Sequence, residues 1–200
     1  TLVYSTLQLI EAAHPEVFGF KHWETMHHDI EYMNQLLLEL SSYNNSECLS
    51  KETICTERFL KSIILSFASS LADTDIEFTS RLEPELPDIC ADSVKLRQVI
   101  LNLLRNAKDA LKMSCPDRKP FIHFHACTFK NQLSITVNDN GCGIQREHID
   151  TIFDPFITYK QNGTGLGLPI SRSIARAHGG SLTVSSKAGG PTEFRLTLPI

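Results

Sequence analysis

The first forty residues repeat apolar positions with the period of a helix. After Gly19 these positions lie three or four residues apart, at Trp23, Met26, Ile30, Met33, Leu37 and Leu40. Such a stripe predicts an amphipathic helix with a bundle-type seam. Residues 2–10 show a shorter piece of the same pattern, and His14-Pro15 with Gly19 separates the two helices. Because a lone hairpin cannot bury this seam, we expect two copies of the chain to pair into a four-helix bundle.

Residues 44–51 are polar and lack a period, which predicts a linker between a hairpin domain, 1–43, and a second domain, 52–200. In the second domain the period changes repeatedly. The pattern predicts helices at 57–71 (N-cap Thr56), from the N-cap Asp92 through Leu104, and at 166–178, with strands at 76–82, 121–129, 133–139, 181–186 and 193–199. The expected class is therefore α+β, with helices on one face of a mixed, mainly antiparallel sheet.

The composition is that of a globular protein, with 42% apolar and 21% charged residues. The apolar runs are far shorter than the roughly 18 residues of a membrane span. The net charge of −4 gives no support to a nucleic-acid or anionic-membrane surface. We therefore expect a soluble chain with no nucleic-acid partner and no membrane segment.

The cysteine pattern indicates reduced, mostly structural thiols. There are six cysteines, at 48, 55, 90, 115, 127 and 142. No two are spaced as Cys-x-x-Cys, and none neighbours a histidine at a spacing typical of metal ligands. This usage predicts a cytoplasmic protein, although an even count does not exclude disulfides.

The helix that begins after Asp92 carries three polar residues on one face. Asn102 and Asn106 lie four residues apart and Asp109 three further on, with apolar flanks. An amide oxygen presented in this way is a ligand for a hard cation such as Mg²⁺, which also takes oxygens from phosphates and water. Taken alone, the asparagines equally suit a solvated or capping role.

The glycines are concentrated late in the chain, since nine of the ten lie between Gly141 and Gly190. The first of them follow Asp139 at the end of a predicted strand, in Asp-Asn-Gly-Cys-Gly-Ile. A carboxylate held there, with glycines turning the chain beneath a planar ring, suits a hydrogen bond from an adenine amino group. Taken alone, the same residues suit an ordinary turn.

A second glycine-rich stretch leads into the predicted helix at 166–178. It reads Gly163-Thr164-Gly165-Leu166-Gly167-Leu168, and Lys160 shortly before it adds a mobile cation. Backbone amides at a helix N-terminus form an anion site, which predicts phosphate binding. The stretch is neither a Walker loop, because no Gly-Lys-Thr/Ser follows, nor a dinucleotide fingerprint, because no βαβ unit surrounds it.

Taken in order, these motifs resemble those of the sensor histidine kinases, within the superfamily that includes gyrase and the mismatch-repair ATPases. The N box is at 98–107 and the first glycine box is Asp139-x-Gly141-x-Gly143. The F box is Phe153-Asp154-Pro155-Phe156, the second glycine box is at 163–168, and residues 189–194 resemble the last glycine box. All five occur in the family's order.

The resemblance implies a two-layer α/β sandwich that holds ATP between the N-box helix and a lid segment, residues 156–163. Asp139 would bind the adenine amino group, and Asn106 would bind Mg²⁺, with Asn102 as the second candidate ligand. Phosphate would meet the amides around Gly165 and Gly167, with Lys160 and Thr164 from the lid segment. The implied nucleotide-binding set is Asn102, Asn106, Asp109, Asp139, Gly141, Gly143, Ile144, Lys160, Gly163, Thr164, Gly165, Leu166, Gly167, Leu168 and Thr192.

Two positions depart from relatives. Tyr159 replaces a threonine common in the subgroup with Thr-Thr-Lys, which leaves the phosphate contact of that position open. Asn102 stands where hydrolysing relatives carry a glutamate that activates water, and an amide cannot act as that base. The resemblance therefore implies that ATP is kept for transfer, so a hydrolysing ATPase ranks third among the hypotheses.

The hairpin resembles the family's dimerisation and phosphotransfer domain, yet no His-Glu-x-x-Asn-Pro-Leu box occurs. We expect the phosphoacceptor histidine upstream of Thr1 and a fragment unable to autophosphorylate. Among the histidines present, His28 beside Asp29 is the best alternative acceptor. The expected partners are a second copy of the chain and a response-regulator receiver domain, in the cytoplasm even if upstream segments anchor the full protein to a membrane. The other open hypothesis is a degenerate nucleotide-binding regulatory module that docks partners without phosphotransfer.

Overall fold

The computed structural model describes residues 2–112, 119–160 and 163–200. The chain divides into two compact units, Thr1–Ser42 and Tyr43–Ile200. Each unit is described by itself.

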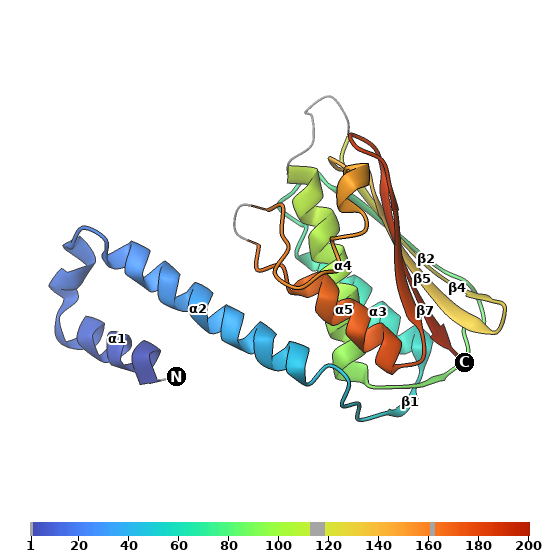
Figure 1. The fold of residues 1–200 in the computed structure, drawn as a ribbon, viewed down its shortest axis with the longest axis horizontal. Coiled ribbons are helices and arrows are strands. Elements are labelled where there is room, and N and C mark those ends of the chain that lie inside the picture. Colours follow the sequence, from blue (N-terminus) through green and yellow to red (C-terminus); the bar gives the residue numbers. More distant parts are fainter. Residues whose placement is uncertain (1, 113–118, 161–162) are drawn as a thin grey trace. The chain divides into compact units, whose positions relative to one another are not determined.

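The first unit consists of helices joined by a short 3₁₀ turn (Figure 1). Helix α1 (Leu2–Ala13) ends before the 3₁₀ helix η1 (Pro15–Gly19), and α2 (Trp23–Asn44) follows. The carboxylate of Glu11 accepts a hydrogen bond from Trp23 Nε1 at 3.1 Å and lies 2.7 Å from His27 Nε2. These polar contacts fasten α1 to the start of α2, and the helix break falls at the predicted proline.

Helix α2 leaves its apolar seam uncovered. None of its residues is buried, and the side chains of Met33 and Leu37 are each 61% exposed. An apolar stripe of this length is unusual on a solvated helix.

The second unit is a sheet with helices on one face (Figure 1). The strand order is β2-β4-β5-β7-β6, and only the β2–β4 pair is parallel. The strands are β2 (Glu77–Leu82), β4 (Phe121–Phe129), β5 (Gln132–Asp139), β6 (Ser181–Ser186) and β7 (Thr192–Pro199). Helix α3 (Thr56–Ser69) contacts β2, α4 (Ser93–Lys112) contacts β4 and β5, and α5 (Gly167–Ala177) contacts β6 and β7. The predicted α+β class is confirmed.

Side-chain alternation along the strands separates a dry face from a solvated one. On β4, Ile122, Phe124 and Ala126 are buried beneath the helices, while His123 and His125 between them are more exposed. Successive side chains of a strand point to opposite faces, so the period of two fixes which residues fill the core.

Helix α4 is the central element of the core. Its buried residues follow the three-and-four spacing of one helix face: Leu96, Val99, Ile100, Leu103, Leu104, Ala107 and Leu111. As predicted, Asp92 caps the helix, because its Oδ1 accepts hydrogen bonds from the backbone amides of Val94 at 3.1 Å and Lys95 at 3.0 Å.

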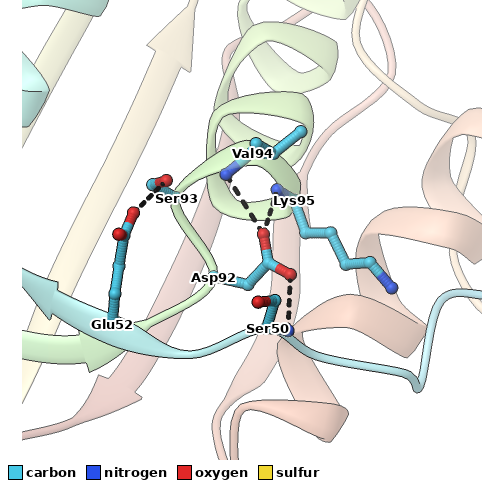
Figure 2. Close-up of a pocket in the computed structure, with 6 residues that line it drawn as sticks. All are labelled: Ser50, Glu52, Asp92, Ser93, Val94 and Lys95. Carbon is cyan, nitrogen blue, oxygen red and sulfur yellow. Dashed lines mark hydrogen bonds between the residues drawn. The ribbon is translucent and has the colours of Figure 1, made fainter.

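The segment expected to be a linker is fastened to the second unit at this cap (Figure 2). The amide of Ser50 donates to Asp92 Oδ2 at 2.9 Å, and Lys95 Nζ donates to the carbonyl of Cys48 at 2.5 Å. Burial alone would raise the pKa of Asp92, but the amide donors of Lys95, Ser50 and Val94 together lower it below its usual value. Asp92 therefore stays ionised and anchors residues 44–51.

His178 connects the far end of α5 to the same cap. Its Nε2 accepts a hydrogen bond from the Asp92 amide at 2.9 Å, and its Nδ1 donates to the Ile174 carbonyl at 2.8 Å. Burial lowers the pKa of His178, which keeps the ring neutral and able to accept. The residue marks the helix terminus that the sequence predicted.

Two features of this unit differ from the sequence prediction. Thr56 is not an N-cap, because that place is taken by Cys55 without a side-chain bond and the Thr56 hydroxyl donates to the Pro87 carbonyl at 2.6 Å. A second sheet was missed, in which β1 (Glu52–Ile54) pairs antiparallel with β3 (Ile89–Ala91). Strands of three residues are too short to show an alternation.

Five cysteines lie in the described part of the chain, and all are free thiols, while Cys115 lies outside it. Cys48, Cys55 and Cys90 are exposed, so a structural role in the core does not apply to these three. Within the described residues, no helix has the length and apolar character needed to cross a bilayer.

Replacing Asp92 by alanine should destabilise the second unit by about 2 kcal/mol, because the α4 cap and the anchor of Ser50 are lost together. Urea unfolding of the whole chain, followed by circular dichroism, measures this loss. Asp88→Ala, at an exposed position three residues after the β2–β3 turn residue Glu85, is the matched control and should change stability by less than about 0.5 kcal/mol. Equal effects of the two substitutions would contradict the anchor.

Candidate nucleotide site

The polar face of α4 contacts the side-chain ammonium of Lys160. Asn106 Oδ1 accepts a hydrogen bond from Lys160 Nζ at 2.7 Å, and Asp109 Oδ2 lies 3.0 Å from the same nitrogen. Lys112 lies 3.7 Å from the other oxygen of Asp109. Three residues that the sequence assigned to the site, two on α4 and one on the lid segment, are thus brought together.

Asn102 makes different contacts from Asn106. Its Nδ2 donates to the Ser171 hydroxyl at 2.9 Å, and a Cβ added at Gly167 would lie 2.6 Å from its Oδ1. The side chain is therefore packed under the first turn of α5. The two asparagines therefore have different partners in this structure, and the contacts of Asn102 are with helix α5.

Asp139 is a buried carboxylate at the end of β5. Its side chain is only 2% exposed, and its Oδ1 accepts a hydrogen bond from the Gly141 amide at 2.9 Å. Burial raises the pKa of Asp139 to about 6, against the smaller lowering effects of the Gly141 amide and the Lys160 ammonium. A buried acid with this pKa is typical of a functional site.

The glycines after Asp139 allow close backbone contacts. Gly143 has a positive φ of 69°, and a Cβ there would collide with the Lys187 carbonyl oxygen. A Cβ at Gly141 would lie 2.7 Å from that of Ala110. Only glycine fits both places, so this turn lies directly against α4.

Sequence reasoning missed Ser186, which joins two residues of the predicted set. Its hydroxyl accepts a hydrogen bond from the Ile144 amide at 2.9 Å and lies 2.7 Å from that of Thr192. Thr192 in turn pairs with Asp139 in the sheet. A serine at the end of a strand carries no local signal of such a role, because the contact depends on the β6–β7 pairing.

A backbone hydrogen bond joins the start of the lid segment to Gly165, just after its end. The Phe156 amide donates to the Gly165 carbonyl at 3.0 Å, and Gly165 has a positive φ of 70°. Residues 161–162 of this segment lie outside the described residues. The Tyr159 ring stacks on that of His148 with 3.7 Å between the ring centres, and its hydroxyl lies 3.0 Å from that of Thr151. These contacts are distinct from those that join Lys160 to α4.

The amino end of α5 follows the second glycine box. The Thr164 hydroxyl accepts a long hydrogen bond from the Leu166 amide at 3.3 Å, and Leu166 is buried while Leu168 is half-buried. Leu166, at the N-cap position, makes no side-chain cap. The side chain of Leu166 therefore does not cap the backbone amides in the first turn of this helix.

A family model supplies the decisive comparison. The model of histidine kinase-, DNA gyrase B- and HSP90-like ATPases matches residues 91–200, which hold every residue of the site described above. The chain belongs to this family. It carries the ATP-binding catalytic domain of the sensor-histidine-kinase type, as the motif order predicted.

Similar curated proteins are sensor kinases of bacteria. The chain is 32% identical over 172 residues to the signal transduction histidine-protein kinase AtoS of Escherichia coli, covering 86% of this chain and 28% of that protein. It is 35% identical over 176 residues to the sensor protein kinase WalK of Staphylococcus saprophyticus, covering 85% and 28%. The chain thus spans little more than a quarter of the length of these relatives.

Solved structures share the fold. ShkA in complex with AMPPNP gives a TM-score of 0.73 at 23% identity, over 88% of this chain and 37% of that one. The catalytic domain of histidine kinase ThkA gives 0.65 at 24% identity, over 75% and 95%. The Acinetobacter baumannii histidine kinase AdeS gives 0.70 at 18% identity, over 98% and 96%. The two-layer histidine kinase sandwich is therefore confirmed as the fold.

The ATPase domain also fits a divalent cation. The side-chain oxygens of Asn106 and Asp109 already converge on one positive charge, the Lys160 ammonium. Amide and carboxylate oxygens are ligands that Mg²⁺ accepts, with phosphate oxygens and water completing its shell.

The buried carboxylate makes the stability of this ATPase domain depend on pH. In the unfolded chain Asp139 ionises near 3.8, whereas in the folded chain its pKa is about 6. The folded state therefore holds the proton up to a higher pH than the unfolded state, and the stability of the wild type should fall by roughly 2 kcal/mol relative to Asp139→Asn between pH 4 and pH 7. Urea unfolding of both proteins across this range measures the difference. Asp88→Asn is the surface control, and parallel curves for Asp139→Asn and wild type would contradict the raised pKa.

Proposed function

We propose that this chain binds Mg²⁺-ATP and transfers the γ-phosphate to a histidine, for relay to a response-regulator aspartate. The observation that carries the proposal is the convergence of Asn106, Asp109 and Lys160 on one charged point, close enough for the ammonium to influence the buried Asp139. Such a site can bind both ends of one nucleotide, with Asp139 at the adenine base and Lys160 at the phosphates.

Asp139 recognises the base in this proposal. Its Oδ1 accepts the Gly141 amide, and as a carboxylate it has further lone pairs for an adenine amino group. The contact needs the ionised form, so nucleotide affinity falls as the pH drops below about 6. Thr192 pairs with Asp139 in the sheet, and the Ser186 hydroxyl lies 2.7 Å from that of Thr192, so both residues lie beside the carboxylate at the strand ends.

Phosphate binding falls to the lid segment and α5. The Lys160 ammonium neutralises charge on the β- or γ-phosphate, and the amides near Gly165 and Gly167 donate at the positive end of the helix dipole. Catalysis by such a site consists of positioning and charge neutralisation, since little covalent chemistry is left for the protein.

The metal in this proposal is held by Asn106, with Asp109 beside it. When bound, Mg²⁺ supplies charge stabilisation to the transferred phosphoryl group. The protein presents the side-chain oxygens of Asn106 and Asp109 from adjacent turns of one rigid helix. The Lys160 ammonium, which contacts both oxygens, has to move away before they bind the ion.

Transfer is favoured over hydrolysis by the contacts of Asn102. Its Nδ2 is bound to Ser171, and an amide has no basic lone pair with which to activate water. We therefore propose that ATP is retained until an acceptor arrives. Because ATP and reduced thiols belong to the cytoplasm, we place the reaction there.

The acceptor is proposed to be none of the eight histidines of this sequence. His28, the best alternative, is exposed, but its Nδ1 lies 4.0 Å from Asp29 Oδ1, which is too long for a hydrogen bond. We further propose that the exposed α2 seam pairs with that of a second copy, because such a heptad-like stripe is covered in a four-helix bundle.

Nucleotide binding tests the site directly. Titration calorimetry with the non-hydrolysable analogue AMPPNP should show binding that Mg²⁺ strengthens. Asp139→Ala should weaken it about 10- to 100-fold, the worth of a hydrogen bond to a charged group, with or without Mg²⁺. Asn106→Ala should remove the strengthening by Mg²⁺ and leave the affinity in chelator unchanged.

Asp88→Ala is the control for this titration and should bind as the wild type does. The proposal is contradicted if nucleotide binding is independent of Mg²⁺, or if Asp139→Ala binds as tightly as the wild type.

Phosphotransfer is tested separately with γ-labelled ATP. The purified chain should take up no label that is acid-labile and base-stable, because none of its histidines is the acceptor. Label that survives base and disappears in His28→Ala would instead make His28 the acceptor. Steady-state release of phosphate would contradict the proposal that Asn102 cannot activate water for hydrolysis.

A further inference from the structure

The solvated face of the sheet carries a cluster of three potential metal ligands, away from every residue of the nucleotide site. Glu83, His125 and Cys127 are half-buried, and their ligand atoms lie within 4.8 Å of one another. Among the described residues these three form the cluster of histidine, cysteine and acidic ligands that could enclose one ion.

Strand pairing explains how the cluster forms. His125 and Cys127 are two positions apart on β4, so both point to the face opposite the buried Phe124 and Ala126. Glu83 directly follows β2, and its amide donates to the Ala126 carbonyl at 2.9 Å, which places it beside them. The sequence analysis found no cysteine at a typical ligand spacing from a histidine, but on a strand residues two positions apart share a face, which brings His125 and Cys127 together.

A polar atom of the cluster has no partner. His125 Nε2 is buried from solvent and makes no hydrogen bond, and Glu83 Oε1 lies 3.7 Å from it. That separation is too long for a hydrogen bond. Nitrogen and oxygen ligands of one tetrahedral zinc ion, with bonds of roughly 2.0–2.2 Å, lie about 3.3–3.6 Å apart, so a shift of a tenth or a few tenths of an ångström lets both atoms bind one ion. Ser134 Oγ, on the strand position paired with Cys127, is also buried without a hydrogen bond.

We propose that Glu83, His125 and Cys127 bind one Zn²⁺ ion. Thiolate, imidazole and carboxylate together are a ligand set suited to zinc, whereas Mg²⁺ takes oxygens, so the two sites differ in the ion they select. The Cys127 thiol releases its proton to solvent when the sulfur binds. Three protein ligands leave a fourth position for water or for an incoming group.

The ion would join the edge strand β2 to β4. β2 contacts one strand of its sheet, and its last residue precedes Glu83, so a bond from Glu83 through the ion to β4 fixes the end of that strand. Bound Zn²⁺ should therefore raise the thermal midpoint of unfolding. This inference does not rest on the proposed nucleotide function.

Cobalt titration of the reduced, metal-free chain in excess Mg²⁺ tests the site. One equivalent of Co²⁺ should give the visible bands of a tetrahedral ion and a thiolate-to-cobalt charge-transfer band, and Zn²⁺ should abolish both. Cys127→Ser should lose the charge-transfer band, and Cys127→Ser and His125→Gln should each bind at least tenfold more weakly. Cys90→Ser and His28→Gln, both at exposed positions, are the matched controls and should bind as the wild type does.

Protection of the Cys127 thiol by Zn²⁺ is a second test, and it uses only the wild-type protein. Zn²⁺ should slow alkylation of Cys127 in the wild type at least tenfold, as measured by peptide mass, and leave Cys55 and Cys90 unaffected. The proposal is overturned if Zn²⁺ protects these three cysteines equally, if no charge-transfer band appears, or if Cys127→Ser retains the wild-type affinity.

Discussion

The packing of α4 against the sheet fixes most of what the second unit does. One face of this helix fills the core with leucine, valine and isoleucine, and the half-buried Asn106 and Asp109 lie along its border. A rotation by one residue, about 100°, would turn the amide of Asn106 into the core or out to solvent, away from Lys160. The buried face therefore sets the position of the binding face, and no separate element is needed to align it.

The start of α4 is held just as firmly. The Asp92 side chain accepts the amides of its own first turn and of Ser50, while its backbone amide donates to His178. One residue thus ties together the helix, the end of α5 and the segment that leads from the first unit. Since the ionised carboxylate and the neutral imidazole are both needed, this junction weakens when acid protonates either group.

Local pattern was sufficient for much of this unit. The period of three and four gave the start of α4 and its cap at Asp92, and the period of two gave the strands from 121 to 139. Thr56 shows the limit of local pattern, because the helix already includes this residue and its hydroxyl donates to the Pro87 carbonyl, which comes from a distant segment. The strands at 52–54 and 89–91 were missed for a related reason, since each is defined mainly by the other.

The candidate nucleotide site also combines features set by neighbouring residues with features set by distant segments. Asp139 and Gly143 were identified from the chain because strand end and turn are adjacent in sequence. Ser186, and the contact of Asn102 with Ser171, depend on which strands and helices become neighbours. The Glu83–His125–Cys127 cluster is a further case, because its acid comes from a parallel strand some forty residues from the cysteine.

Charge accounts for the position of Lys160. Asp109 is a carboxylate beside the amide oxygen of Asn106, and Asp139 is a second acid nearby whose burial raises its pKa. Without a positive charge among them, the acids would repel one another and Asp139 would hold its proton still more tightly. The hydrogen bond between Phe156 and Gly165 closes the base of the segment that carries Lys160, so the ammonium is kept within reach of the acids. The position of Lys160 is thus set by the acids around it and by the backbone that carries it.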